Sequence, residues 1–380
     1  MVEIKKIAVI GCGAMGSGIT YQAARFGYLV SVVEINQELL DKGMNKIRND
    51  IRYGIDRGKI ELKDAEALFA RIKPTVNLQE AVSDADMVIE AIVENMQIKK
   101  DLFAQLDQYT STEAILASNT SSLSITEIAS ATQRQDKCIG MHFFNPVPAM
   151  RLLELVITDQ TSEQTIESAE QVGKRLDKIT VRAKDTPGFI VNRVLLPEIG
   201  EAIAILEEGI ATPDEIDKIT VSRLGWPVGP LTLSDFTGLD VGLSIAKYMH
   251  EMLGECWKPS PYHEKLIAEG KFGDKQGGGW LQHYPTFGIE KSPKAAEYTP
   301  ELLVHRIVVR ILGEAARLVD LGVTEEDINI ACRYGLNWPK GPFELISELG
   351  AEALLSMSQK LYSEKGECYK LPVTLEKMLK

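Results

Sequence analysis

The feature that most constrains the fold is a glycine-rich turn near the start of the chain. Gly11, Gly13 and Gly16 directly follow the β-branched run 5–10 and open a helical stretch from Ala14 to Phe26. In a strand–turn–helix unit the first glycine permits the turn, the second lets the backbone approach a pyrophosphate, and the third lets helix and strand pack closely. The pattern predicts an N-terminal α/β domain that binds a dinucleotide.

The same unit predicts which dinucleotide binds. The first turn of the helix, with Ala14 and Met15, would offer unpaired N–H groups and the positive end of the helix dipole to the phosphates. A second strand, 29–34, ends in Glu34, close to where a ribose-binding acid is expected. Its carboxylate would accept hydrogen bonds from an unmodified ribose and repel a 2′-phosphate, and residues 35–37 include no cation. We therefore expect NAD as the cofactor.

The pattern of apolar and β-branched residues changes near residue 186. Up to 185, β-branched runs alternate with amphipathic stretches, which is typical of a Rossmann-type parallel sheet covered by helices. The candidate strands are 5–10, 29–34, 87–91, 114–118, 137–144 and 151–158. From Pro187 onward β-branched runs become scarce and helical periods are separated by Gly-Pro turns. An all-α region is expected there.

The helical region contains an internal repeat. Several positions recur 113 residues later, among them Arg193 as Arg306 and Glu201 as Glu314, and this offset would align Asp217 with Ile330. The motif Trp-Pro-x-Gly-Pro at 226–230 returns at 338–342, an offset of 112. We predict a Rossmann-type domain followed by two copies of an all-α domain. The expected boundaries are 1–185, 186–283 for the first copy, 284–297 for a linker and 298–380 for the second copy.

Composition excludes several classes of protein. The formal net charge of −12 argues against a general nucleic-acid or membrane-surface binder, since both need a basic field. No apolar run is long enough to span a bilayer, and the N-terminus runs straight into a strand, so we expect neither a membrane anchor nor a secretory leader. The five cysteines include no Cys-x-x-Cys pair, which predicts reduced thiols and a cytoplasmic location.

A histidine and a glutamate form the candidate catalytic pair. His142 stands where a strand ends, and Glu154 lies within the next apolar run, 152–156. If these strands pair antiparallel, Glu154 reaches His142, and a carboxylate among leucines and valines needs such a partner. Alcohol oxidation requires a base that accepts the hydroxyl proton and an acid that orients the imidazole and stabilises its charged form.

Two polar groups could complete the site. The cluster 118–122, Ser-Asn-Thr-Ser-Ser, should lie at the carboxyl end of a strand, where ligands bind in open α/β sheets, although its hydroxyls could instead cap the helix near Ile125. Asn192 is a polar residue at an otherwise apolar helix start, and a substrate carbonyl could satisfy its amide.

These motifs resemble the L-3-hydroxyacyl-CoA dehydrogenase family over residues 5 to about 283. The resemblance rests on 118–122, on His-Phe-Phe-Asn-Pro at 142–146 and on 185–193. It implies NAD-dependent interconversion of a 3-hydroxyacyl-CoA thioester and its 3-oxo form. It also implies roles for individual residues: His142 as general base, Glu154 as its orienting partner, Ser121 and Asn192 at the substrate, and Glu94, Lys99, Asn119 and Asn145 around the cofactor. Without the resemblance, Glu94 and Lys99 would be an ordinary surface pair.

The second helical copy departs from the family's short members, which end near residue 283 and dimerise through this domain. Long multifunctional β-oxidation proteins carry such a copy, so we expect a structural role, with the chain acting as a monomer with an internal pseudo-dimer or as a homodimer. The copy has His305 where the first has Asn192. We otherwise expect the chain to bind an acyl-CoA thioester as its substrate, and neither nucleic acid nor a membrane.

Two other functions compete. A dehydrogenase of a free hydroxy acid would need a cation near Ser121 and Asn192, and Arg193 is the obvious candidate. An inactive nucleotide-binding structural protein would not need His142 and Glu154 together.

Overall fold

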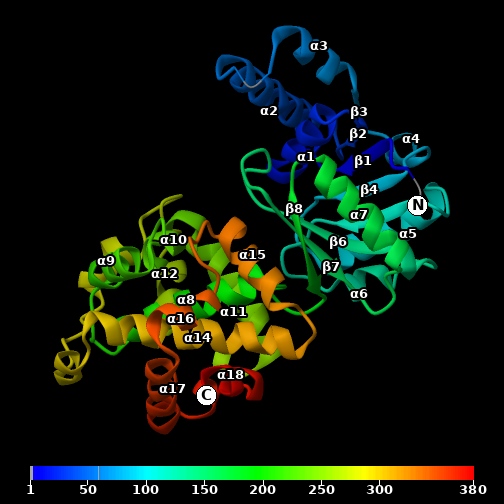
Figure 1. Cartoon of the computed structure of the whole chain (residues 1–380). Helices are drawn as coiled ribbons and strands as arrows, with labels where there is room; N and C mark the ends of the chain where they lie inside the picture. The colour runs from blue at the N-terminus through cyan, green and yellow to red at the C-terminus, as the bar shows by residue number, and fades with distance from the viewer. Residues whose placement is uncertain (1–2, 59) are drawn as a thin grey trace. The chain divides into compact units, whose positions relative to one another are not determined.

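The computed structural model describes residues 3–58 and 60–380. It divides into two compact units, Met1–Thr186 and Pro187–Lys380 (Figure 1). The first unit is an α/β domain and the second is helical, which confirms the fold class expected from the sequence. Within the described ranges, no helix is long and apolar enough to cross a membrane.

The first unit is built on one eight-stranded sheet with the order β3-β2-β1-β4-β5-β6-β7-β8. Only β6 and β7 pair antiparallel; the other neighbours are parallel. The strands are β1 Lys6–Ile10, β2 Leu29–Val33, β3 Ile72–Thr75, β4 Met87–Glu90, β5 Ile115–Ser118, β6 Cys138–Phe143, β7 Leu152–Ile157 and β8 Ile179–Lys184. The carboxyl ends of β1, β4, β5 and β6 therefore share one edge of the sheet.

Two of these strands were missing from the sequence-based assignment, which contained six. β3 and β8 are the two edge strands of the sheet. β3 includes Pro74, and β8 alternates half-buried, buried and exposed positions. Edge strands need no continuous apolar run and tolerate proline, so neither gave the signal of a buried parallel strand.

Helices cover the sheet and share its core. One buried cluster joins Ile7 and Val9 of β1 with Ile19 of α1 and Val172 of α7. The helices of this unit are α1 Ala14–Arg25, α2 Gln37–Asp56, α3 Leu62–Ala70, α4 Leu78–Val82, α5 Met96–Tyr109, α6 Ile125–Ala129 and α7 Glu163–Arg175, with a 3₁₀ turn η1 Gln135–Lys137.

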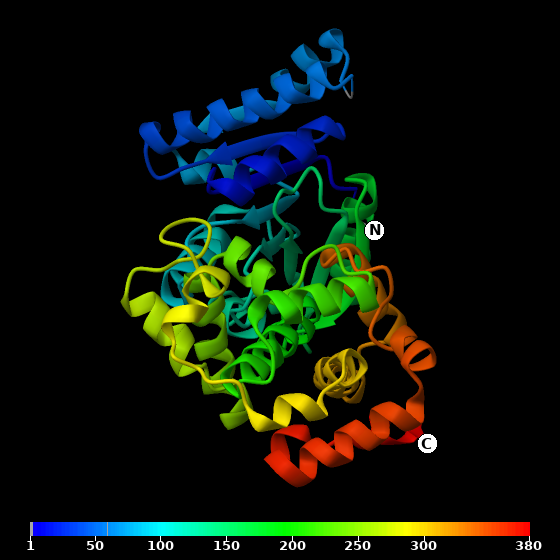
Figure 2. The ribbon, with the colours of Figure 1, turned by 90° about the vertical axis from the view of Figure 1, so that its left-hand side faces the viewer.

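The second unit contains the same series of helices twice. The first series is α8 Val191–Glu207, α9 Pro213–Leu224, α10 Pro230–Thr237, α11 Leu239–Leu253, η2 Glu255–Trp257 and α12 Pro261–Ala268. The second is α14 Pro300–Asp320, α15 Glu325–Gly335, α16 Glu344–Leu349, α17 Ala351–Lys365, η5 Glu367–Tyr369 and α18 Val373–Leu379. Between them lie α13 Trp280–His283, η3 Tyr284–Thr286 and η4 Pro293–Glu297. α14 packs against both α8 and α17 (Figure 2).

The structure corrects the alignment of the repeat. Thr212 caps α9 and Thr324 caps α15, so the offset is already 112 at these caps. Asp217 accepts a hydrogen bond from the N–H of Leu231, as Asn329 does from that of Phe343. The counterpart of Asp217 is therefore Asn329, not Ile330. The missing residue belongs to the turn before these caps, where a deletion disturbs no helix.

Equivalent residues of the two copies meet in crossed pairs. Arg193 forms a buried ion pair with Glu314 at 2.7 Å, and Arg306 forms one with Glu201 at 2.5 Å. Trp226 stacks on its own counterpart Trp338, with ring centroids 4.4 Å apart. Reciprocal contacts and self-contacts of this kind are those of a two-fold, isologous interface, here within one chain.

The interface also overturns the expectation of five reduced thiols. Cys256 and Cys368 form a disulfide with a sequence separation of 112, whereas Cys12, Cys138 and Cys332 are free and buried. Rules for closely spaced cysteines do not predict this pair, because the two cysteines lie far apart in the sequence. That separation equals the repeat offset, so the two cysteines are equivalent positions brought together near the two-fold axis.

Candidate active site

The glycine turn has the geometry that a bound dinucleotide requires. Gly11 has φ +91°, and a Cβ there would lie 2.6 Å from the carbonyl oxygen of Ala91. A Cβ at Gly16 would lie 1.9 Å from the carbonyl oxygen of Gly11, so the α1 helix can approach β1 only with glycine there. A Cβ at Gly13, by contrast, would meet nothing within 4 Å. Space is therefore open at the N-terminus of α1, where Ala14 and Met15 form the first turn.

Glu34 closes this turn from the end of β2. Its Oε1 accepts a hydrogen bond of 2.7 Å from the N–H of Cys12, and its Oε2 accepts one from the N–H of Ile35. The side chain is half-buried, so its carboxylate is held beside the glycine turn and still reaches solvent. These residues fit the adenosine ribose and pyrophosphate of NAD. Burial, with the charge of Glu34, raises the pKa of the Cys12 thiol to about 12, so this cysteine is unreactive.

His142 and Glu154 face each other across β6 and β7. The two strands pair antiparallel, as expected, with His142 directly opposite Glu154. His142 Nδ1 lies 2.6 Å from Glu154 Oε2, and Glu154 is fully buried. An ionised carboxylate can only accept, so the proton of this hydrogen bond resides on Nδ1 and Nε2 is left as the basic nitrogen. The phenyl ring of Phe144 lies against the imidazole at 4.5 Å.

The polar loop after β5 surrounds a buried ion pair. Lys99, 1% exposed, lies 2.5 Å from the carboxylate of Glu90 at the end of β4 and 3.3 Å from Glu94. Glu90 also accepts from the hydroxyl of Ser118 at 2.6 Å. Lys99 is thus a buried cation that pairs with both carboxylates, and not a member of an exposed surface pair. Sequence reasoning missed Glu90, although an acid at the end of the apolar run 87–89 could have indicated it.

Glu94 organises the loop that carries Ser121. It accepts hydrogen bonds from the hydroxyls of Thr120 and Ser122 and from the N–H of Ser121. The helix-capping role considered for this cluster belongs instead to Ser124, which accepts from the N–H of Glu127 at the start of α6. The hydroxyls of Thr120 and Ser122 are thus bound to Glu94 in the loop that follows β5 at the carboxyl edge of the sheet.

The three asparagines of the predicted site lie in different surroundings. Asn119 Oδ1 accepts a 2.9 Å hydrogen bond from the N–H of Phe143, which ties the end of β5 to β6 beside His142. Asn145 follows β6 and is exposed. Asn192 is the second residue of α8 and belongs to the helical unit.

Comparison with known proteins identifies the family. The NAD-binding domain model of 3-hydroxyacyl-CoA dehydrogenase matches residues 6–186, and the C-terminal domain model matches 188–283 and 303–380. The chain belongs to the 3-hydroxyacyl-CoA dehydrogenase family. As a member it is an NAD-dependent oxidoreductase. The second match of the C-terminal model, 303–380, falls on the second series of helices.

Individual relatives agree with this family. A probable 3-hydroxybutyryl-CoA dehydrogenase of Deinococcus radiodurans is 44% identical over 280 residues, covering 73% of this chain and all of the relative. The human mitochondrial hydroxyacyl-coenzyme A dehydrogenase is 42% identical over 289 residues, covering 74% of this chain and 92% of the relative. The solved structure of 3-hydroxybutyryl-CoA dehydrogenase from Escherichia coli K12 is 28% identical, with a TM-score of 0.92, covering 100% of this chain and 98% of that one.

Proposed function

We propose that this enzyme interconverts (S)-3-hydroxyacyl-CoA and 3-oxoacyl-CoA, with His142 as the proton-transfer group. The observation that carries the proposal is the 2.6 Å contact between His142 Nδ1 and the buried Glu154 carboxylate. With Nδ1–H donating to Glu154, Nε2 accepts the proton of the substrate hydroxyl. Glu154 then stabilises the imidazolium that results and keeps the ring oriented. In the reverse direction the same nitrogen returns the proton.

The cofactor is held by the turn and acid at the start of the sheet. Bound NAD supplies the hydride acceptor or donor. The N–H groups of Ala14 and Met15 at the α1 N-terminus would hold the pyrophosphate, and the Glu34 carboxylate would accept hydrogen bonds from the ribose. Around the nicotinamide half we place Glu94, Lys99, Asn119 and Asn145, with Lys99 acting through its ion pairs to fix Glu94 and Glu90.

Ser121 and Asn192 are proposed to bind the substrate near the reacting oxygen and the thioester carbonyl. Hydroxyl and amide donors placed at an oxygen that gains charge stabilise the transition state. The competing free hydroxy acid would need a cation there, and Arg193 was the candidate. Arg193 is 5% exposed and paired with Glu314 at 2.7 Å, so it is committed to the helical interface. This favours the uncharged thioester over a free carboxylate.

The test is the pair of variants His142→Gln and His305→Gln. Loss of a general base should lower kcat of His142→Gln by about two to four orders of magnitude. His305 lies in the second copy, so the same substitution there should change kcat less than about twofold. Titration of NADH by fluorescence should give the same Kd for both variants. Unchanged turnover by His142→Gln would refute the assignment.

We also propose that the second copy is structural and replaces the helical domain of a partner subunit, with boundaries at 186–283 and 298–380. The crossed ion pairs and the stacked tryptophans support an internal pseudo-dimer. Light scattering should then give the mass of one chain, and a dimer mass would favour the homodimer. A cytoplasmic location stays a prediction that the disulfide challenges, because disulfides are rare in that compartment.

A further inference from the structure

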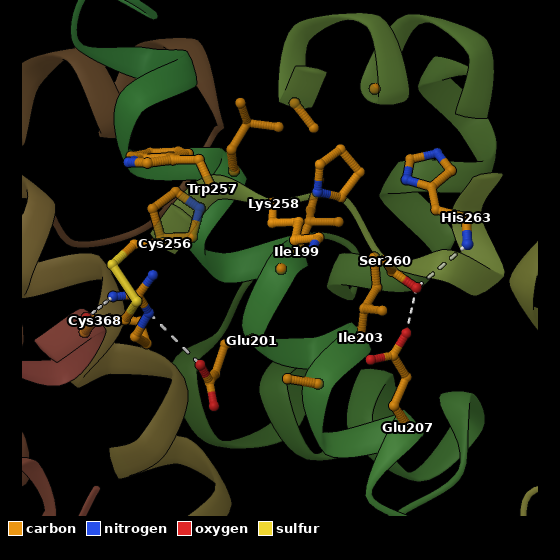
Figure 3. Close-up of a pocket in the computed structure, with 18 of the residues that line it drawn as sticks. Ile199, Glu201, Ile203, Glu207, Cys256, Trp257, Lys258, Ser260, His263 and Cys368 are labelled. Atoms are coloured by element: carbon orange, nitrogen blue, oxygen red, sulfur yellow. Dashed lines mark hydrogen bonds and ion pairs between the residues drawn. A yellow bond between two sulfur atoms is a disulfide. The ribbon is translucent and has the colours of Figure 1, made fainter. Parts of the chain in front are cut away.

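A groove runs along α8 in the helical unit. Its volume is about 400 Å³, within the range of about 300–1,000 Å³ that is usual for small-molecule sites. One wall is α8 itself, and the other is formed by α11 and the segment 255–260 (Figure 3). Residues of the second copy, among them Arg310 and Tyr369, line one end.

The α8 wall continues the helix face that carries Asn192. Leu196, Ile199 and Ile203 follow Asn192 at spacings of four, seven and eleven, which fall on one side of a helix with about 3.6 residues per turn. Leu196 and Ile199 are half-buried. These apolar side chains are therefore open to the groove, and the row begins one turn beyond Asn192.

Gly200 widens the groove in the middle of this row. It is exposed, lines the groove, and a Cβ built on it meets nothing within 4 Å. Glycine inside a helix costs about 1 kcal/mol relative to alanine, and no close backbone approach requires it here. Because it has no side chain, Gly200 leaves space along α8 in the groove.

The opposite wall carries apolar side chains beside polar ones and is fixed in place. Its apolar members are Trp257, Pro259 and Ala246, and its polar members include Thr237 and Lys258. The guanidinium of Arg193 lies 5.4 Å from the ring centroid of Trp257. The disulfide from Cys256 to Cys368 holds the adjoining backbone to the second copy, as Figure 3 shows beside Trp257.

Several polar groups at the groove are bound to one another. Glu207 accepts a hydrogen bond from the hydroxyl of Ser260, Arg310 pairs with Glu201, and Lys365 pairs with Glu208. His263 makes a 2.8 Å hydrogen bond with the carbonyl oxygen of Leu239. Lys258 and Glu255 also line the groove; both are exposed, and their charged groups lie 3.9 Å apart. The apolar row on α8 and the ring of Trp257 offer a ligand an apolar surface, and an alkyl chain matches that chemistry.

We propose that the acyl chain of the thioester lies in this groove, so that Leu196, Ile199, Gly200, Ile203 and Trp257 set the preferred chain length. The inference rests on the proposed function, which puts the thioester at Asn192. From Asn192 to Ile203 the helix rises about 16 Å, which suits a medium or long chain and exceeds a four-carbon one. Acetoacetyl-CoA would not reach beyond the start of the row.

The variant Gly200→Leu tests the groove by filling it. Its open surroundings and the higher helix propensity of leucine favour folding. The measured quantity is the ratio of kcat/KM for 3-oxododecanoyl-CoA to that for acetoacetyl-CoA. Each methylene group that is excluded from the groove should lower the binding affinity about fourfold, so the ratio of the two kcat/KM values should fall at least about tenfold. Gly200→Ala should lower it less, and Ile203→Trp serves as a second way of filling the groove.

The matched control is Ser222→Leu, which adds leucine to an exposed position of α9 outside the groove and should leave the ratio at the wild-type value. A wild-type ratio in both Gly200→Leu and Ile203→Trp would overturn the inference and leave the proposed function intact. The inference would also be overturned if the wild-type enzyme reduced acetoacetyl-CoA but no 3-oxoacyl-CoA with a longer acyl chain. Failure of every 3-oxoacyl-CoA would remove the proposed function, and the inference with it.

Discussion

Two buried carboxylates of this enzyme, Glu154 in the sheet and Glu201 in the helical unit, have partners of different kinds. Glu154 pairs with the imidazole of His142 and Glu201 with the guanidinium of Arg306. An imidazole gains and loses its proton near neutral pH, whereas a guanidinium stays charged. The first pair can move a proton, and the second can only hold two helices together.

The two pairs also differ in whether a substrate can reach them. His142 stands at the carboxyl edge of the sheet, where substrates reach parallel strands. Arg306 belongs to α14 and is fully buried where this helix packs on α8, and its arrangement is repeated by Arg193 with Glu314. The comparison teaches that burial of a charge does not by itself indicate catalysis; the pKa range of the partner and its access to substrate do.

The largest stability effect is expected at Arg306. Arg306→Met removes the cation that Glu201 and Glu208 share, and leaves them with Arg310 and Lys365 respectively. Removal of one partner of a buried pair costs about 3–5 kcal/mol of unfolding free energy. Urea unfolding measures this loss. Lys218→Met breaks the exposed pair with Asp214 and should cost less than about 1 kcal/mol. Equal losses of unfolding free energy in the two variants would mean that the buried pair of Arg306 is no more stabilising than an exposed one.

The disulfide should contribute slightly less. Replacing Cys256 and Cys368 by serine removes a link across a sequence separation of 112, which is expected to cost about 2–5 kcal/mol, mainly by freeing the unfolded chain. Unfolding with and without dithiothreitol measures the same difference in the natural protein. If dithiothreitol leaves the midpoint unchanged, the ion pairs and stacked tryptophans alone hold the copies together.

A third carboxylate, Glu198, sharpens the comparison because neither of its oxygens has a hydrogen-bond partner among the residues that the structure describes. Burial, with the nearby charge of Asp217, raises its pKa well above the ordinary value. The folded state therefore favours the protonated form. Its contribution to stability is fully present at acid pH and is lost as the pH rises above the ordinary glutamic acid pKa of about 4.3.

Glu198→Leu should therefore raise the unfolding free energy by about 1–3 kcal/mol at pH 8 and by less at pH 4. The second copy already has an apolar residue here, Ile311. Glu364→Leu, on the exposed surface of α17, serves as the control and should stay within about 0.5 kcal/mol at both pH values. A gain that does not depend on pH would mean that the pKa of Glu198 is the same in the folded and unfolded states, and would contradict the raised pKa.

Much of the site could be predicted because its chemistry is local in sequence. The glycine turn, Glu34 and the antiparallel neighbours His142 and Glu154 all follow from short-range patterns. Glu90 could have been noticed as an acid at the end of the run 87–89, but its partner could not be predicted, because Lys99 lies on another element and is turned inward. Cys256 and Cys368 were missed for a different reason: their proximity follows from the two-fold relation of the copies, which the repeat implied but spacing rules for neighbouring cysteines do not consider.

The most direct test of the account is NADH oxidation, followed by its absorbance, with acetoacetyl-CoA beside free acetoacetate and with NADPH as the alternative cofactor. Rapid turnover of the thioester with NADH, and little with acetoacetate or NADPH, is the predicted result. Comparable turnover of acetoacetate would contradict the claim that the enzyme selects thioesters because Arg193 is paired with Glu314. Measurable NADH binding with no thioester turnover would contradict the assignment of the His142–Glu154 pair to 3-hydroxyacyl-CoA oxidation.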